Sequence, residues 1–214
     1  MQIKICGISE DTALEAAVSG GASHIGLVFY PRSPRHVTKD KAKALSKAAE
    51  RRISRVGLFV DPDDRALEDV LKSVPLEMIQ LHGGESAARV SEVRRLTGLP
   101  VMKACKIADQ SDVEQAKPYF QVADIVLFDA KPPKDHPDAL PGGNALSFDW
   151  TLIEGMGRHG PWALSGGLTP DNVLEAIAAT GADFVDVSSG VEDAPGRKSP
   201  EKIAAFIAAA KKAG

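Results

Sequence analysis

The sequence predicts an α/β protein of the (β/α)8 TIM-barrel class, with residues 1–214 forming a single domain. Short runs rich in β-branched residues alternate from end to end with runs rich in Ala, Glu and Lys, which is typical of repeated βα units on a parallel sheet. Eight such units can be counted, so the 214 residues leave roughly 27 for each, near the lower end for this barrel. A doubly wound open sheet is the main alternative, but its usual number of about six strands leaves some units without a place.

The individual elements follow in chain order from composition. Strands are predicted where β-branched and aromatic residues gather, at 2–6, 24–29, 54–60, 78–81, 101–106, 124–129, 162–165 and 184–188. Helices are predicted between them, several with a Ser, Thr or Asp cap, at 11–19, 39–50, 63–74, 86–97, 111–117, 150–158, 170–180 and 200–211. Glycines that end helices are expected at Gly20, Gly21, Gly98 and Gly181.

One connection is conspicuously long. It runs from Ala130 to Ser147 and is rich in proline, lysine and glycine. A loop of this length in a compact domain is usually either a functional lid or a mobile insert, and both interpretations stay open.

Composition narrows the class of protein. The formal net charge is −3, with acidic and basic residues interspersed, so the sequence predicts no nucleic-acid partner and no anionic membrane surface. The two cysteines, Cys6 and Cys105, are too few for a disulfide framework, and the N-terminus lacks the pattern of a signal peptide. No apolar run approaches the ~18 residues of a membrane span. We therefore expect a soluble, cytoplasmic protein.

Candidate catalytic residues are expected where the strands end, because active sites of this barrel lie at the C-terminal ends of its strands. Those positions hold Cys6, Asp129, Ser165 and Ser188, with His82 and Asp61 just beyond strand ends. Because side chains alternate along a strand, Lys4 and Cys6 should face the barrel interior while Ile3 and Ile5 face the helices.

A charge near the first cysteine gives a hypothesis about its chemistry. An inward ammonium is costly unless it is paired, so we expect Lys4 to pair with Asp129 or Asp186 and to lower the pKa of Cys6. The alternative is that Cys6 is a small apolar filler. Nothing in the sequence favours a chemical role for Cys105, and a structural role is expected there.

Two loops have the composition of a phosphate-binding site. The segment LSGGLTPDN at 164–172 passes through Gly166 and Gly167 into a helix expected to start at Pro170, and VDVSSGVE at 185–192 contains Ser188, Ser189 and Gly190. The loops after strands seven and eight commonly bind phosphate in this fold, because glycines let the backbone approach and serines add donors. The alternative is that both are merely tight turns.

A third loop, at 29–38, carries Arg32, Arg35 and His36. Arg35 is suited to a carboxylate, which a guanidinium binds through two parallel hydrogen bonds, although a solvated loop arginine is the alternative.

Taken together, the motifs are similar to those of one family. They span nearly the whole chain in order: KICGI, GLVFYPRSPRHV, QLHG at 80–83, LFDAK at 127–131, GGxxxxFDW at 142–150, LSGGLTPDNV at 164–173 and VDVSSGVE at 185–192. This set resembles the phosphoribosylanthranilate isomerases of tryptophan biosynthesis. The resemblance implies a (β/α)8 barrel that converts an aminoaldose phosphosugar to a ketose by an Amadori rearrangement, with no metal or organic cofactor.

The resemblance also implies roles for individual residues. Cys6 matches the general base and Asp129 the general acid, and Arg35 matches the arginine that holds the anthranilate carboxylate. Asp186 resembles a residue that orients the substrate. The phosphate would bind at Gly166, Gly167, Ser188, Ser189 and Gly190. His82 is a candidate substrate-binding residue, although a supporting role is equally open. The only expected partner is the small-molecule phosphosugar, with the chain acting as a monomer or homodimer.

The sequence departs from the family pattern at one position, and three alternative functions can be compared with it. Ala145 stands where the family commonly has a second loop glycine, which bears on the conformation of the long loop. Indole-glycerol-phosphate synthase usually carries an extension before its first strand, whereas this first strand starts at residue 2. A non-catalytic phosphosugar-binding barrel would not need both Cys6 and Asp129. A serine hydrolase is not expected without a GxSxG elbow.

Overall fold

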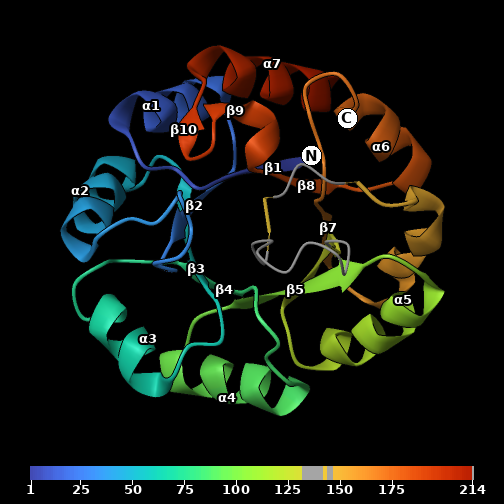
Figure 1. Cartoon of the computed structure of the whole chain (residues 1–214), viewed down its shortest axis with the longest axis horizontal. Coiled ribbons are helices and arrows are strands. Elements are labelled where there is room, and N and C mark those ends of the chain that lie inside the picture. Colours follow the sequence, from blue (N-terminus) through green and yellow to red (C-terminus); the bar gives the residue numbers. More distant parts are fainter. Residues whose placement is uncertain (132–141, 144–146, 214) are drawn as a thin grey trace.

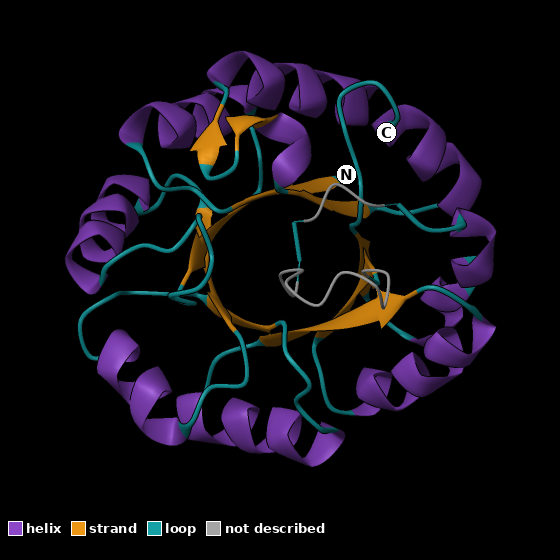
Figure 2. Ribbon diagram, in the orientation of Figure 1, coloured by secondary structure: helices purple, strands orange, loops and turns teal. Residues whose placement is uncertain are grey.

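The computed structural model describes residues 1–131, 142–143 and 147–213, and in it the strands close into a parallel barrel. Figure 1 shows the barrel from one end, and Figure 2 shows the helices as a ring around it. The strands pair in chain order and β1 pairs with β8, so the predicted (β/α)8 barrel is confirmed. Their bounds are β1 Gln2–Cys6, β2 His24–Val28, β3 Ser54–Phe59, β4 Met78–Leu81, β5 Val101–Ile107, β6 Ile125–Ala130, β7 Trp162–Leu164 and β8 Phe184–Val187.

The helices of the outer ring follow the predicted order. Their bounds are α1 Asp11–Gly20, α2 Lys39–Ala49, α3 Asp64–Leu71, α4 Ala87–Thr97, α5 Gln110–Ala116, α6 Val173–Thr180 and α7 Pro200–Ala210. Thr38, Asp63, Ser86, Asp109 and Ser199 cap the starts of five of them through their side-chain oxygens. Gly21, Gly98 and Gly181 have positive φ and end α1, α4 and α6, as expected.

Two helix predictions are wrong in detail. The segment 150–158 forms two 3-10 turns, Trp150–Ile153 and Met156–His159, because Gly155 interrupts it with φ +73°. The helix expected from Pro170 begins three residues later, at Val173. The side chain of Asn172 accepts a hydrogen bond from the Thr169 N–H and donates one to the Gly167 carbonyl. This local turn replaces the first turn of the predicted helix.

The sequence analysis missed a hairpin between β8 and α7. Its strands are β9 Glu192–Ala194 and β10 Arg197–Lys198, and they pair antiparallel. In Figure 1 the hairpin lies near α1 and α7. The two short strands were hidden because their residues are mostly charged and lack the alternation of a half-buried strand.

The alternation predicted for β1 is confirmed. Ile3 and Ile5 belong to the apolar layer between the barrel and the helices, which also contains Leu14 of α1 and Ile207 of α7. Lys4 and Cys6 face inward, where Cys6 packs against Val28 and Leu58. In the described part of the chain no helix is long and apolar enough to cross a membrane.

His24 makes the stability of the barrel sensitive to mild acid. Its ring stacks on Phe184 with centroids 5.0 Å apart, and burial, with Lys4 nearby, lowers its pKa from 6.5 to about 4. Between pH 6.5 and 4 the unfolded chain therefore binds more protons than the folded one. The contribution of His24 to stability is complete above pH 6.5 and is lost as the pH falls through this window.

We expect the free energy of unfolding to fall between pH 7 and pH 5 by about 1 kcal/mol more in the native chain than in His24→Asn. This is about half of the full linkage value, because His24 keeps part of its exposure to solvent. Chemical denaturation at the two pH values measures the difference. An equal fall in both proteins would contradict the assignment to His24.

Candidate active site

A pocket of about 490 Å³ opens at the C-terminal ends of the strands. It brings together seven residues that the sequence singled out, namely Cys6, Arg35, His82, Asp129, Ser165, Asp186 and Ser188. A smaller pocket of about 340 Å³ adjoins it at the ends of β7 and β8. Gly143, Asp129, Ser165, Asp186 and Ser188 line both, so the two form one continuous site.

Cys6 ends β1 at the wall of the larger pocket, with 5% of its surface exposed. Neighbouring glycines make room for it. A Cβ atom on Gly26 of β2 would lie 2.8 Å from the Cys6 Sγ, closer than a carbon can approach. Gly7, directly after Cys6, has φ +81°, which favours glycine, and the Arg35 side chain packs against it.

Lys4 forms the ion pair that the sequence predicted, and its partner is Asp186 rather than Asp129. The Lys4 Nζ lies 2.9 and 3.0 Å from the two carboxylate oxygens of Asp186 on β8. Burial acts to lower the pKa of Lys4, but the attractions of Asp186 and Cys6 together outweigh it and the pKa is raised. Lys4 therefore carries a full charge directly beneath Cys6.

The predicted effect of Lys4 on Cys6 has the right sign, because Lys4 acts to lower the pKa of the thiol, but it does not decide the outcome. Burial raises the pKa of the Cys6 thiol above its usual range, and the opposing attraction of Lys4 for the thiolate does not cancel it. The sequence placed the cation correctly but could not weigh it against the loss of water around the sulfur. The raised pKa accordingly favours the thiol form of Cys6.

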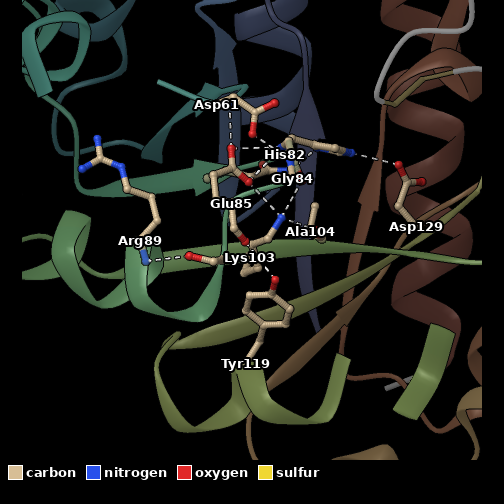
Figure 3. A network of polar contacts seen from close by, with 12 residues as sticks. Asp61, His82, Gly84, Glu85, Arg89, Lys103, Ala104, Tyr119 and Asp129 are labelled. Carbon is tan, nitrogen blue, oxygen red and sulfur yellow. Dashed lines mark hydrogen bonds and ion pairs between the residues drawn. The ribbon is translucent and has the colours of Figure 1, made fainter. Parts of the chain in front are cut away.

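Asp129 on β6 is held by His82, directly after β4, which is held in turn by Gln80 on β4. The His82 Nε2 lies 3.0 Å from the Asp129 Oδ2 (Figure 3), and the Gln80 Nε2 lies 3.0 Å from the His82 Nδ1. With Gln80 donating to Nδ1, the imidazole carries its proton on Nε2 and donates it to Asp129. This leaves the Asp129 Oδ1 to face a ligand.

A buried ion pair fixes the backbone next to His82. The Lys103 Nζ lies 2.9 Å from the Glu85 Oε2 and donates to the Gly83 carbonyl at 2.8 Å. Glu85 in turn accepts hydrogen bonds from the Gly83 and Asp61 backbone N–H groups, so the ends of β3, β4 and β5 are tied together (Figure 3). Asp61 therefore belongs to the hydrogen-bond network of Glu85. Cys105 is not part of this network and lies in the apolar outer layer, where burial raises the pKa of its thiol to about 12.

Arg35 lies in the pocket wall, but one edge of its guanidinium is already occupied. Its Nε and Nη2 each donate to a carboxylate oxygen of Glu192 at 2.8 Å, and Nη2 also donates to the Gly143 carbonyl at 3.2 Å. Lys198 binds the same carboxylate, with its Nζ 2.8 Å from the Glu192 Oε1.

Sequence reasoning missed Glu192, Lys198 and Gln80 as parts of the site. Two signals were available. Glu192 closes the motif at 185–192, and Gln80 is a polar residue at an inward position two residues before His82.

The smaller pocket is lined by the predicted phosphate loops. Gly166 and Gly167 have φ +86° and +65°, and a Cβ on Gly166 would lie 2.6 Å from the Ala130 backbone nitrogen, so both conformation and space call for glycine. Within the described residues, the backbone N–H groups of Gly166, Gly167, Ser189 and Gly190 have no protein acceptor. These donors suit an anion.

The predicted phosphate-binding residues differ in position. Ser188 and Ser189 line the smaller pocket, whereas Gly190 packs against the carbonyl of Leu168. Gly190 therefore brings the two loops close together. Most of the loop from Ala130 to Ser147, including Ala145, lies outside the described residues, so its two interpretations stay predictions.

Comparisons with known proteins point to one family. The family model described as N-(5'-phosphoribosyl)anthranilate (PRA) isomerase matches residues 3–209. A protein of Paracoccus denitrificans named N-(5'-phosphoribosyl)anthranilate isomerase is 55% identical over 210 residues, covering 98% of this chain and 97% of that protein. The crystal structure of phosphoribosyl anthranilate isomerase from Thermotoga maritima has a TM-score of 0.87 at 35% identity, with 99% of each chain covered.

A second similar structure contains a ligand. It is described as a phosphoribosyl anthranilate isomerase in complex with reduced 1-(o-carboxyphenylamino)-1-deoxyribulose 5-phosphate, and it has a TM-score of 0.84 at 34% identity, with 99% of each chain covered.

The environment of Cys6 yields a prediction about its reactivity with iodoacetamide. In a Cys105→Ala background, we expect the alkylation of Cys6 to shift to higher pH by about one unit in Lys4→Met, because the thiolate loses its cation. Lys4→Met/Asp186→Asn is the matched control, since it leaves no unpaired carboxylate. Because Lys4 affects the pKa of Cys6 more than Asp186 does, this variant should shift in the same direction. A pH profile equal to that of the Cys105→Ala parent in both variants would contradict the role of Lys4.

Proposed function

Because the chain belongs to the N-(5'-phosphoribosyl)anthranilate isomerase family of tryptophan biosynthesis, we propose that its barrel mouth isomerises N-(5'-phosphoribosyl)anthranilate by general acid–base catalysis. The product is 1-(2-carboxyphenylamino)-1-deoxyribulose 5-phosphate. The observation that carries the proposal is that Cys6 and Asp129 line one pocket, continuous with a cradle of backbone donors. These are the groups that the reaction requires: a base, an acid and a phosphate site.

The two pockets differ in chemistry, and this difference orients the substrate. The larger one has an apolar wall of Val28, Leu58 and Val60 beside Arg35, which suits an aromatic ring that carries a carboxylate. The smaller one offers glycine N–H groups and serine hydroxyls, which suit the phosphate. The ribose then lies against the shared residues, among them Asp129 and Asp186.

Asp129 performs the first step as the general acid. It donates its proton to the ring oxygen of the ribose while the bond between that oxygen and the anomeric carbon breaks. The nitrogen of the anthranilate supplies the electron pair, and a protonated Schiff base results. His82 holds one oxygen of Asp129, so the other is the one directed at the sugar.

Cys6, whose thiol first releases its proton to water, performs the second step as the general base. Its thiolate removes the proton from the carbon next to the Schiff base, which the cationic nitrogen has made acidic, and an enolamine forms. Tautomerisation of the enolamine gives the ketose. The positive charge of Lys4 and of the Schiff base itself favours the thiolate at this stage, which offsets the cost of burial.

Asp186 has two roles in this proposal. Its carboxylate pairs with Lys4, and the residue lines both pockets, where it can accept hydrogen bonds from the ribose hydroxyls. One chain, residues 1–214, supplies every group that the mechanism uses. Whether it acts as a monomer or a homodimer stays a prediction.

We expect purified protein to convert freshly made phosphoribosylanthranilate, with the decay of its fluorescence as the readout. In Cys6→Ala and in Asp129→Asn, kcat should fall by about a thousandfold, because each change removes a proton-transfer group. Cys105→Ala is the control and should keep the native rate. Decay that survives both changes would overturn the mechanism, and no decay with native protein would overturn the proposed function.

His82 is expected to act by positioning Asp129. His82→Leu should lower kcat by about tenfold or more with KM little changed, because the lost hydrogen bond acts on the acid and not on substrate affinity. His82→Gln keeps a donor near the position of Nε2 and should restore part of kcat. A rise in KM at unchanged kcat would instead indicate that His82 contacts the substrate.

A further inference from the structure

The hairpin of β9 and β10 supplies two buried charged side chains, Glu192 and Lys198, next to Arg35. The side chains of Arg35, Glu192 and Lys198 are only 6%, 4% and 1% exposed. Glu192 and Lys198 are not among the residues that line either of the two pockets in the described chain. Buried ion pairs cost desolvation and are weak evidence for stability by themselves, so their retention here calls for an explanation.

Glu192 binds the guanidinium of Arg35 along one of its edges. Its Nε and Nη2 bind the two carboxylate oxygens of Glu192 in parallel, each at 2.8 Å. The other edge, formed by Nη1 and Nη2, meets the backbone of Gly143 in the mouth of the pocket, where Nη2 donates to the Gly143 carbonyl. A carboxylate that replaces this carbonyl finds two parallel donors in a fixed plane.

Lys198 balances the charge of Glu192. Its Nζ lies 2.8 Å from the Glu192 Oε1 and also donates to the carbonyl of Ser188 at 2.9 Å. Burial lowers the pKa of Lys198 to about 8, although Glu192 favours its charged form. With two cations and one anion, the cluster keeps one net positive charge near neutral pH. Without Lys198, Glu192 would neutralise Arg35.

The hairpin is also fixed against the loop that carries Arg35. The Gly196 N–H donates to the Glu192 Oε2 at 3.3 Å, and a Cβ on Gly196 would collide with the carbonyl of Pro34. The backbone of the hairpin therefore packs directly on the 29–38 loop, and Glu192 cannot move independently of Arg35.

We propose that Glu192 and Lys198 are positioning residues that set specificity for the carboxylate of the substrate. Glu192 holds the guanidinium of Arg35 by one edge so that the other edge faces the pocket, and Lys198 preserves its positive charge. The inference rests on the proposed function, in which Arg35 receives the anthranilate carboxylate.

The test compares two non-reacting ligands by isothermal titration calorimetry at pH 7. One is reduced 1-(o-carboxyphenylamino)-1-deoxyribulose 5-phosphate, and the other is the same compound without its carboxyl group. The Kd of the ligand without the carboxyl group, divided by the Kd of the ligand with it, is the carboxylate preference. This ratio is insensitive to the chemistry of Cys6. We expect Glu192→Gln and Lys198→Met each to reduce the preference by about tenfold, with binding of the ligand without the carboxyl group little changed.

The double variant Glu192→Gln/Lys198→Met separates position from charge. It keeps the net charge of the native cluster and replaces a buried ion pair by neutral groups, which proteins usually tolerate. We expect its preference to stay about tenfold low, because Arg35 is no longer held. A preference equal to the native one would overturn the proposal, since net charge alone would then suffice. An unchanged or higher preference in Glu192→Gln would overturn it as well.

Two controls complete the design. Lys202→Met removes a half-exposed charge that contacts only the backbone of Glu192 and the side chain of Asp193, and it should leave the preference within about twofold. Arg35→Leu should abolish the preference. If the native protein shows no carboxylate preference, or if Arg35→Leu keeps the preference, the role of Arg35 in the proposed function fails. If only the Glu192 and Lys198 variants behave like native protein, the further inference alone fails.

Discussion

The ion pair between Lys4 and Asp186 is the constraint on which the site depends. It joins β1 to β8 across a separation of 182 residues, at the seam where the barrel closes. Lys4 is fully buried and Asp186 nearly so, and removal of one partner would leave an uncompensated charge, at a cost of about 3–5 kcal/mol. The register of β1 against β8 therefore determines whether the site forms, because a slip of one residue would turn Lys4 outward and Cys6 away from the pocket.

The three proposed functional side chains, Cys6, Asp129 and Arg35, are each held by a different kind of neighbour. Cys6 is buried against apolar side chains, and burial outweighs the attraction of Lys4, so its thiolate forms only at an energetic cost that a cationic intermediate can offset. Asp129 is held by neutral hydrogen bonds through His82 and Gln80, which direct one of its oxygens without adding a charged group. Arg35 is held by a charged pair. The proposed base is therefore tuned by desolvation, whereas the proposed acid and the proposed carboxylate-binding arginine are tuned by orientation.

Much of this arrangement followed from the sequence, because it depends on local patterns. The alternation along β1 placed Lys4 and Cys6 inside, and the strand ends pointed to Asp129 and to the loops that line the smaller pocket. What the sequence could not provide depended on balances or distant contacts. The net pKa of Cys6 required a comparison of burial with Lys4, and the role of Glu192 required a hairpin that only tertiary packing reveals. The start of α6 failed because one side chain, Asn172, competes with the helix.

The two anionic ends of the proposed substrate are distinguished by the surroundings of each pocket as well as by the groups that bind them. Asp129 and Asp186 line the smaller pocket and offer an anion carboxyl oxygens rather than a cation, so an anion there must be held by directional N–H groups. A tetrahedral phosphate with three oxygens can use several such donors, whereas a planar aromatic carboxylate can use fewer. At the other end, Val28 and Leu58 favour the aromatic ring, and a phosphoribosyl group offers them no apolar surface. Reversed binding is therefore disfavoured at both ends, which keeps the ribose between Asp129 and Cys6.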